Sequence, residues 1–285
     1  MSTVLITGTS TGIGLETAVQ AAAAGHTVVA TMRDTGRSGL LREAAEAAGV
    51  TVDIRTLDVT DAASIATCVA GAVEAHGGLD VVVNNAGFAG SIPPFEMCPM
   101  DRYRAAFEIN FFGVVSVTQA VLPHLRASRG RLLTVGSTRG LIAQPFNECY
   151  SAAKFAVEGF LESLAPTAAA MGVDVVVVAP GPVLGTAFAA NSGATRDSLL
   201  AESGPYTEVF TSYLDWFAGT GFPGAQTAAE VAAILVETCT AEDPPFRLLT
   251  GPWAEKFAAL KLVEPDGRRL LAMTSAWVRN EDAER

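Results

Sequence analysis

The sequence predicts an α/β fold, a doubly wound parallel sheet with helices on both faces. Strand-like and helix-like segments alternate along the chain, as crossovers between parallel strands require. The runs 81–83 and 175–178 consist of valine and do not alternate with polar residues, which is typical of strands covered on both faces. Since no linker divides the 285 residues, we expect residues 1–285 to form a single domain.

The periodicity predicts seven strands and six helices between them. The strands are expected near residues 3–7, 27–31, 51–57, 79–84, 130–136, 173–179 and 246–249. The helices are expected near residues 13–25, 38–48, 61–76, 100–128, 148–171 and 227–239.

The stretch from Gly181 to about Gln226 has little regular periodicity, and we expect it to be a substrate-binding loop after the sixth strand. It is rich in aromatic residues, which favours a lid that covers a bulky apolar substrate and excludes water. The alternative is that the helical spacing of four of these aromatics reflects a short helix packed on the body. Both interpretations remain open for this set: Phe188, Tyr206, Phe210, Tyr213, Trp216, Phe217 and Phe222.

A glycine-rich turn, residues 7–14, joins the first strand to the first helix. Its glycines allow the backbone to approach a pyrophosphate, whose charge the helix N-terminus then meets. An ordinary tight turn is the alternative, but the place between strand and helix favours a nucleotide site. The predicted cofactor contacts here are Gly8, Ser10, Thr11, Gly12, Ile13 and Gly14.

Tyr150 and Lys154 form a second motif, with Ser137 thirteen residues before the tyrosine. A phenol has a reference pKa of about 10, so it needs a nearby cation to act in acid–base chemistry at neutral pH. Residues four apart lie on one face of a helix, which places the ammonium one turn from the phenol. Ser137 follows a strand, at the sheet edge where such folds bind ligands. The trio indicates hydride transfer chemistry.

With these motifs, the chain resembles the short-chain dehydrogenase/reductase family, whose sheet is of the Rossmann type. Further matches, in the family's order, are Asp58 in Leu-Asp-Val, the run 84–87, Asn110 in Ile-Asn-Phe-Phe-Gly and the pair 180–181. The segments 30–33, 145–159 and 182–188 look most like the 17β-hydroxysteroid and retinol dehydrogenase branch. The resemblance is strong over residues 3 to about 190.

The resemblance implies the residue roles. Tyr150 would be the acid or base, Lys154 would lower its pKa and bind the nicotinamide ribose, and Ser137 would hold the substrate oxygen. Asn110 would anchor a water that relays protons to Lys154. Asp58 would meet the adenine edge. The further residues expected to line the cofactor are Val59, Asn85, Ala86, Gly87, Pro180, Gly181, Val183 and Thr186.

Arg33, just after the second strand, bears on the choice of cofactor. In this fold an acidic residue there binds the ribose of NAD, whereas an arginine accommodates the 2′-phosphate of NADP. The planar guanidinium suits that dianion, so NADP (NADPH) is expected and NAD is less favoured. If Arg33 instead pairs with Asp34 in solvent, the preference stays open.

Composition restricts the partners. There are 30 acidic against 19 basic side chains, a net charge of −11, which disfavours nucleic acid. The four cysteines are scattered and show no metal-ligand spacing, so we expect no metal and a reducing, cytoplasmic location. No uninterrupted apolar run approaches the roughly 18 residues of a membrane span. The family's usual pairing through the helices near 100–128 and 148–171 implies a homodimer or homotetramer.

These features predict an NADP-dependent oxidoreductase. It would interconvert a ketone and a secondary alcohol, or an aldehyde and an alcohol, on a bulky hydrophobic substrate such as a steroid, retinoid or polyketide. The alternative is a regulatory protein of the same fold that senses NADP without turnover. Ser137, Tyr150 and Lys154 argue against it, because a sensor does not need them.

Overall fold

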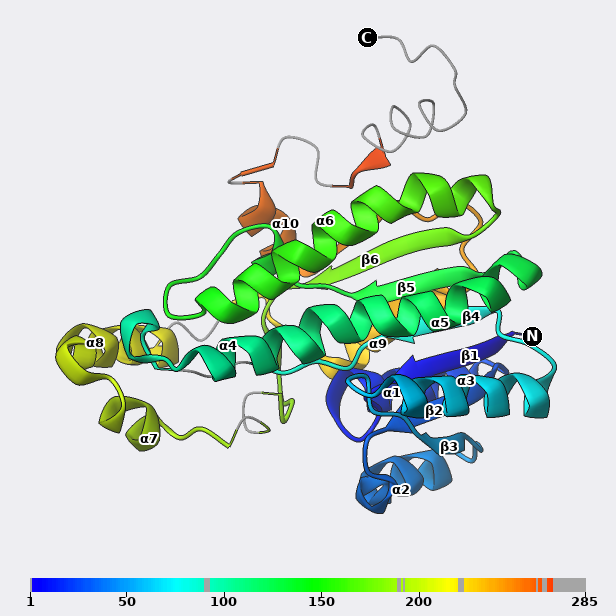
Figure 1. The fold of residues 1–285 in the computed structure, drawn as a ribbon, viewed down its shortest axis with the longest axis horizontal. Helices are drawn as coiled ribbons and strands as arrows, with labels where there is room; N and C mark the ends of the chain where they lie inside the picture. Colours follow the sequence, from blue (N-terminus) through cyan, green and yellow to red (C-terminus); the bar gives the residue numbers. More distant parts are fainter. Residues whose placement is uncertain are drawn as a thin grey trace, which may run out of the picture.

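A seven-stranded parallel sheet forms the centre of the molecule (Figure 1). The computed structural model describes residues 2–89, 93–188, 191, 193–219, 223–259, 261–262 and 266–268. The strand order is β3-β2-β1-β4-β5-β6-β9, and every neighbouring pair is parallel. The predicted strands are confirmed, with bounds β1 Thr3–Thr7, β2 Thr27–Met32, β3 Asp53–Thr56, β4 Val81–Asn84, β5 Arg131–Val135, β6 Asp174–Pro180 and β9 Arg247–Thr250.

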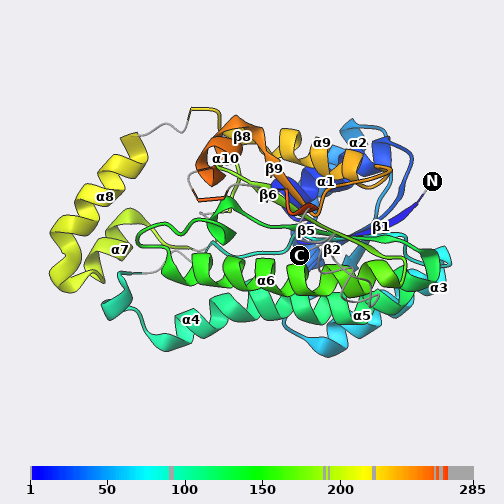
Figure 2. The same cartoon turned by 90° about the horizontal axis from the view of Figure 1, so that it is seen from above.

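Helices cover both faces of this sheet, as Figure 2 shows from above. Helices α3, α4, α5 and α6 lie on one face, and α1, α2 and α9 lie on the other. The doubly wound architecture is therefore confirmed. The helix bounds are α1 Gly12–Ala23, α2 Gly39–Ala47, α3 Ala62–His76, α4 Met100–Phe107, α5 Gly113–Ser128, α6 Glu148–Ala170, α9 Ala228–Thr238 and α10 Gly251–Ala258.

The core consists of two apolar layers separated by the sheet. Val82 and Leu132 belong to the layer that includes the buried residues of α3, α5 and α6, whereas Val81, Val83 and Leu133 belong to the layer that includes α1 and α9. Successive residues of a strand point to opposite faces. A strand covered on both faces must therefore be apolar at every position, which explains the valine runs.

A turn of π-helix, Glu108–Phe112, lies between α4 and α5 where the sequence predicts one regular helix. A π-turn widens the helix locally, and such turns occur often at functional sites. Here it includes Asn110, which is fully buried. One extra residue in a single helical turn hardly changes the periodicity of apolar residues. The sequence therefore did not predict this π-turn.

The run Met100–Ser128 has the length and apolar composition of a membrane-crossing helix, with a mean hydropathy of 1.5 in its best window, of which 39% is buried inside the protein. It is the one such candidate among the described residues. Core helices of soluble proteins meet the same criterion. In this protein α5 packs on the sheet and contributes to the core. The expected absence of a membrane span stays a prediction.

The stretch after β6 contains regular structure, so the prediction of an irregular loop there was wrong. Strand β7 (Val183–Leu184) pairs with β8 (Gln226–Thr227), and the helices α7 (Arg196–Ala201) and α8 (Thr207–Gly219) lie between them. A capping box formed by Thr195 and Ser198 starts α7. Short helices of this kind depend on caps and tertiary contacts rather than on a long apolar period.

Helix α8 uses its aromatic residues in two ways. The Phe210 ring is 2% exposed and lies 4.7 Å from the ring of Phe146, and Tyr213 contacts the same ring at 5.0 Å. Trp216 is 61% exposed. The packed-helix interpretation is therefore correct for part of the aromatic set. Whether α8 moves as a lid stays a prediction, and Phe222 lies outside the described residues.

Candidate functional site

The candidate site lies at the carboxyl edge of the sheet, where the strand order reverses. Strands β2 and β3 follow β1 to one side, and β4, β5 and β6 follow on the other. Crevices at such a reversal bind ligands in open α/β sheets. The predicted residues of the turn 8–14, the loop 85–87, Ser137 and the segment 180–186 directly follow β1, β4, β5 and β6, so the fold brings all four segments to this edge.

The glycine turn is packed too closely for larger residues. Gly8 has a φ of +72°, and a Cβ there would lie 2.8 Å from the Ala86 Cα. A Cβ on Gly14 would overlap the Asn85 side chain and the Gly8 carbonyl. Gly12, with a φ of +62°, faces Thr186 at 3.6 Å. The backbone of α1 can therefore approach a diphosphate without intervening side chains.

Hydrogen bonds fasten this turn to the loop after β4. The Thr7 hydroxyl accepts from the backbone N–H groups of Asn85 and Ala86, both at 3.0 Å. The Asn85 side-chain amide donates to the carbonyls of Thr7 (2.8 Å) and Gly8 (2.9 Å). Asn85 therefore positions the turn, while Ala86 and Gly87 line the space beside it.

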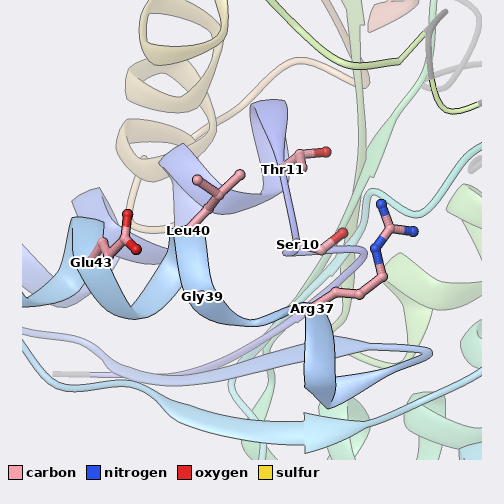
Figure 3. A pocket seen from close by; sticks show the side chains of 6 residues that line it. All are labelled: Ser10, Thr11, Arg37, Gly39, Leu40 and Glu43. Carbon is pink, nitrogen blue, oxygen red and sulfur yellow. The ribbon is translucent and has the colours of Figure 1, made fainter.

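A pocket of about 360 Å³ lies between the glycine turn and the segment after β2 (Figure 3). Ser10 and Thr11, two of the predicted cofactor contacts, line it. Arg37, which sequence reasoning missed, lies beside Ser10, while Glu43 lies away from it. The available signal was a second arginine four residues after Arg33. The full lining is Ser10, Thr11, Arg37, Gly39, Leu40 and Glu43.

Arg33 is exposed and does not use Asp34 as a partner in this structure. The Asp34 carboxylate instead accepts from the Gly36 N–H at 2.9 Å and caps the short helix Thr35–Arg37. No hydrogen bond or ion pair engages Arg33 among the described residues. Two arginines, Arg33 and Arg37, are thus present near the end of β2.

Asp58 and Val59 follow β3. The Asp58 carboxylate accepts from the Thr60 N–H (2.9 Å) and hydroxyl (2.7 Å), which fixes the turn. Val59 packs against the start of α5, where a Cβ on Gly113 would lie 2.8 Å from its methyl group. Val59 is therefore partly a core residue, and Ile13 of the glycine turn packs against the other apolar layer in the same way.

Tyr150 and Lys154 lie one turn apart on α6, as the sequence predicts. They are 9% and 6% exposed, and the Lys154 Nζ lies 5.8 Å from the centre of the Tyr150 ring. Nζ also donates to the Val135 carbonyl at 2.9 Å. Ser137 begins the short helix Thr138–Gly140, and its hydroxyl accepts from the Arg139 N–H at 3.1 Å.

Burial dominates the protonation of this pair. It raises the pKa of Tyr150 to about 12, against the lowering effects of a hydrogen bond with Ser137 and of the Arg139 charge. Burial lowers the pKa of Lys154 to about 8, which the carboxylate of Glu158 opposes. The cation that lowers the pKa of Tyr150 here is Arg139, which the sequence did not point to. The corresponding role of Lys154 stays a prediction.

A buried ion pair between Glu158 and Arg247 lies one turn after Lys154 on α6. The Glu158 carboxylate accepts from the Arg247 Nε (3.0 Å) and Nη2 (2.8 Å), and the two side chains are 7% and 6% exposed. Burial raises the pKa of Glu158, and Arg247 lowers it. The four-residue spacing between Lys154 and Glu158 indicates that the two side chains are neighbours on α6. The pairing of Glu158 with Arg247 could not be predicted in this way, because it depends on β9 lying beside β6 in the sheet.

Asn110 closes the loop that follows Gly87. Its Oδ1 accepts from the Phe88 N–H and its Nδ2 donates to the Phe88 carbonyl, both at 2.9 Å. These two bonds place the π-turn against the loop that follows β4. The predicted role of Asn110 as a water anchor stays a prediction.

The segment after β6 forms the other wall of the site. Pro180 is buried at the end of β6, and a Cβ on Gly181 would lie 2.9 Å from the Trp253 ring. Val183 begins β7 and packs against a core layer. The Phe188 ring lies 5.8 Å from the Tyr150 ring in an edge-on arrangement. The apolar wall of the site therefore combines this segment with α10.

The described residues contain no group of three or more His, Cys, Asp or Glu side chains arranged to hold a metal ion. All four cysteines are free and buried. Cys149 directly precedes Tyr150, and burial raises the pKa of its thiol to about 11. At neutral pH this thiol is protonated and a poor nucleophile.

Comparisons with known proteins agree with this geometry. Residues 2–197 match the family described as short chain dehydrogenase. The chain is 38% identical to retinol dehydrogenase 8 of Bos taurus over 278 residues, covering 93% of this chain and 86% of the relative. It is 35% identical to human 17-beta-hydroxysteroid dehydrogenase type 1 over 272 residues, covering 93% and 82%. A solved short-chain dehydrogenase from Streptomyces avermitilis is 30% identical, with a TM-score of 0.72 and coverage of 91% and 92%.

Removing the Glu158 charge tests the buried ion pair. We expect Glu158→Gln to lower the free energy of unfolding by about 3–5 kcal/mol, because the buried charge of Arg247 would lose the carboxylate that lies closest to it. Glu162→Gln is the matched control, since Glu162 contacts the same arginine at 3.4 Å but is 38% exposed; it should cost about 0–1 kcal/mol. Urea unfolding measures both. Equal losses would contradict the argument.

The depressed pKa of Lys154 predicts how stability varies with pH. Its folded pKa of about 8 lies below the ordinary lysine value of 10.5, so between these values the unfolded chain binds more protons than the folded one. Stability from this group therefore rises with pH above about 8. We expect the free energy of unfolding of Lys154→Met to rise less with pH between 8 and 10 than that of the parent protein. Parallel curves would show an unperturbed Lys154.

Proposed function

The chain belongs to the short-chain dehydrogenase family, and from this premise we propose that it is an NADP-dependent oxidoreductase for a bulky hydrophobic substrate. Family membership makes it an NAD(P)-dependent enzyme that acts on CH–OH groups. The proposed reaction interconverts a ketone and a secondary alcohol, or an aldehyde and an alcohol. The observation that carries the proposal is the buried arrangement of Tyr150 and Lys154 beside Ser137.

The carboxyl edge of the sheet fits a dinucleotide. At Gly8 and Gly14, where a Cβ would clash, no side chain covers the backbone. The pocket between Ser10 and Arg37 suits the adenosine part of the dinucleotide. A nicotinamide dinucleotide supplies or accepts the hydride when it is bound. The chain's contribution is to position that group and to move the proton.

Tyr150 would perform the proton transfer. Because burial raises its pKa to about 12, the phenol holds its proton at neutral pH and is ready to donate it to a carbonyl oxygen during reduction. The reverse reaction needs the phenolate, which the hydrogen bond with Ser137 and the Arg139 charge favour. Ser137 would hold the substrate oxygen, and Lys154 would bind the nicotinamide ribose.

The NADP preference rests on two arginines. Arg33 has no partner among the described residues, and Arg37 lines the pocket beside Ser10. Two guanidinium groups near the end of β2 favour a 2′-phosphate over a hydroxyl. An alcohol dehydrogenase from Thermococcus sibiricus, solved with 5-hydroxy-NADP, has the same fold at 23% identity and a TM-score of 0.70.

The proposed substrate is large and apolar. The relatives at 35–38% identity are named for retinol and a 17-beta-hydroxysteroid. The ring of Phe188 lies beside Tyr150 and offers an apolar surface at the predicted reacting group. A non-catalytic NADP sensor is not favoured by any observation.

NADPH absorbance with a panel of hydrophobic ketones and aldehydes tests the proposal.

We also propose a homodimer or homotetramer in the cytoplasm. The helices predicted to pair, α4–α5 and α6, carry exposed apolar side chains, among them Phe112 (47% exposed) and Phe155 (36%). Light scattering of the purified protein would give its mass in solution. A monomer at micromolar concentration would contradict the proposed assembly.

Replacing the proton donor should abolish most of the activity. We expect Tyr150→Phe to reduce turnover by roughly a hundredfold to ten-thousandfold, the usual range for a general acid or base, because the ring stays but the transferable proton is lost. NADPH binding, measured by fluorescence titration, should change little. Tyr206→Phe is the control, since it removes a phenol hydroxyl that bonds to Glu96 and not to Ser137. Activity above a tenth of the parent value would contradict the role of Tyr150.

The cofactor preference is testable at the two arginines. We expect Arg33→Asp to shift the ratio of NADPH to NADH affinity toward NADH by about 10- to 150-fold, because a contact to a charged group contributes about 1.5–3 kcal/mol. Arg37→Ala should weaken NADPH binding and leave NADH binding nearly unchanged. Direct titration of both cofactors measures this. A parent protein that binds NADH more tightly would overturn the NADP proposal.

A further inference from the structure

Arg139 is a cation in the wall of the site that the proposed reaction does not use directly. It lies two residues after Ser137 in the short helix Thr138–Gly140, and its backbone N–H donates to the Ser137 hydroxyl. Its guanidinium carbon lies 5.7 Å from the centre of the Trp253 ring and 5.1 Å from that of Phe257. The two rings stack on α10 at 4.6 Å. Cation–π contacts thus hold the guanidinium beside the reacting residues.

Among the residues that the structure describes, no acidic side chain neutralises this cation. Among the described residues, no carboxylate lies within ion-pair distance of Arg139, and its guanidinium makes no hydrogen bond. Arg139 is half-buried, and the three other arginines with buried or half-buried side chains do have carboxylate partners: Arg131 pairs with Asp174, Arg247 with Glu158 and Arg55 with Asp53. Burial also lowers the pKa of Arg139. A guanidinium taken from water without a partner carries an uncompensated desolvation cost.

We propose that Arg139 binds a carboxylate on the substrate, so that the enzyme acts on hydrophobic oxo acids or hydroxy acids. This inference rests on the proposed function. A planar guanidinium binds a carboxylate through two parallel hydrogen bonds, and the aromatic rings around it contact the apolar part of the same molecule. The two lysines of this region are already engaged, since Lys154 donates to the Val135 carbonyl and Lys261 donates to the Leu141 carbonyl. One free guanidinium matches a singly charged carboxylate better than a phosphate dianion.

The competing role for Arg139 is electrostatic. Its charge lowers the pKa of Tyr150, and an arginine with this role alone would serve only the proton transfer. The two roles differ in their dependence on the substrate. A carboxylate contact affects acids and leaves neutral substrates alone, whereas an effect on Tyr150 changes the turnover of every substrate equally and shifts the pH profile.

The first experiment measures binding without turnover. Decanoate and decanamide have the same chain and differ in charge, and each is titrated into the NADPH complex by tryptophan fluorescence. We expect the parent protein to bind decanoate about 10- to 150-fold more tightly, the range for a hydrogen bond to a charged group, and Arg139→Met to abolish this difference. Arg126→Met, an exposed arginine at the end of α5, should behave as the parent. Equal binding of both probes by the parent protein would overturn the proposal.

The second experiment measures specificity in turnover. Long-chain oxo fatty acids, with the ketone placed at successive carbons, are each compared with their methyl ester using NADPH. We expect kcat/KM to favour at least one acid over its ester by 10-fold or more, Arg139→Met to remove that preference while ester turnover persists, and Arg139→Lys to restore part of it. An equal loss for acid and ester would assign Arg139 to Tyr150 instead. If no ketone is reduced, the proposed function fails, and the decanoate titration still decides the role of Arg139.

Discussion

The hydrogen bonds between the end of β1 and the loop after β4 are the constraint on which the site depends. Strand order reverses between these two strands, so the chain leaves β1 toward α1 on one face and leaves β4 toward α4 and α5 on the other (Figure 2), and the loops between them define the crevice. Thr7 and Asn85 supply the bonds that hold both loops. Because Gly8 and Gly14 bring the chain into direct contact with Asn85 and Ala86, a shift of either loop would displace the whole edge where a dinucleotide would lie.

Charge burial is the second constraint, and it explains why α6 is attached to β9. Lys154 is almost fully buried and bears a charge that its surroundings disfavour. Glu158, one turn later, opposes that effect, and Arg247 in turn stabilises Glu158. The last strand of the sheet thus influences the protonation of a residue next to Tyr150. A low local dielectric makes each of these interactions stronger than at the surface.

Much of this arrangement could be predicted from the sequence, because its signals are local. Valine runs indicate buried strands, the turn 7–14 joins a strand to a helix, and the spacing of Tyr150 and Lys154 places them on one helix face. The features that escaped prediction depend on the packing of distant segments. The π-turn at Asn110, the Glu158–Arg247 pair and the contact of Arg139 with α10 each join residues more than 20 positions apart or alter one helical turn. The weak periodicity of the segment 181–226 favoured a loop and hid α7, a helix of 6 residues that begins at a capping box, whereas the helical spacing of the aromatic residues did indicate α8 as the alternative.

The positions of the two cations beside Tyr150 suggest a division of tasks. Lys154 lies on α6 and donates toward the end of β5, on the side of the predicted cofactor contacts. Arg139 is held on α10 by Trp253 and Phe257, and the same Trp253 packs against Gly181 after β6. A substrate that enters along this wall would meet the guanidinium and the phenol together. The charge at Arg139 therefore has two consequences: it favours the phenolate of Tyr150, and it provides a place for an anion that would otherwise be repelled by a protein with a net charge of −11. An acidic protein that handles an acidic substrate requires such a local cation, and among the described residues Arg139 is the one whose position satisfies that requirement at the reacting end of the site.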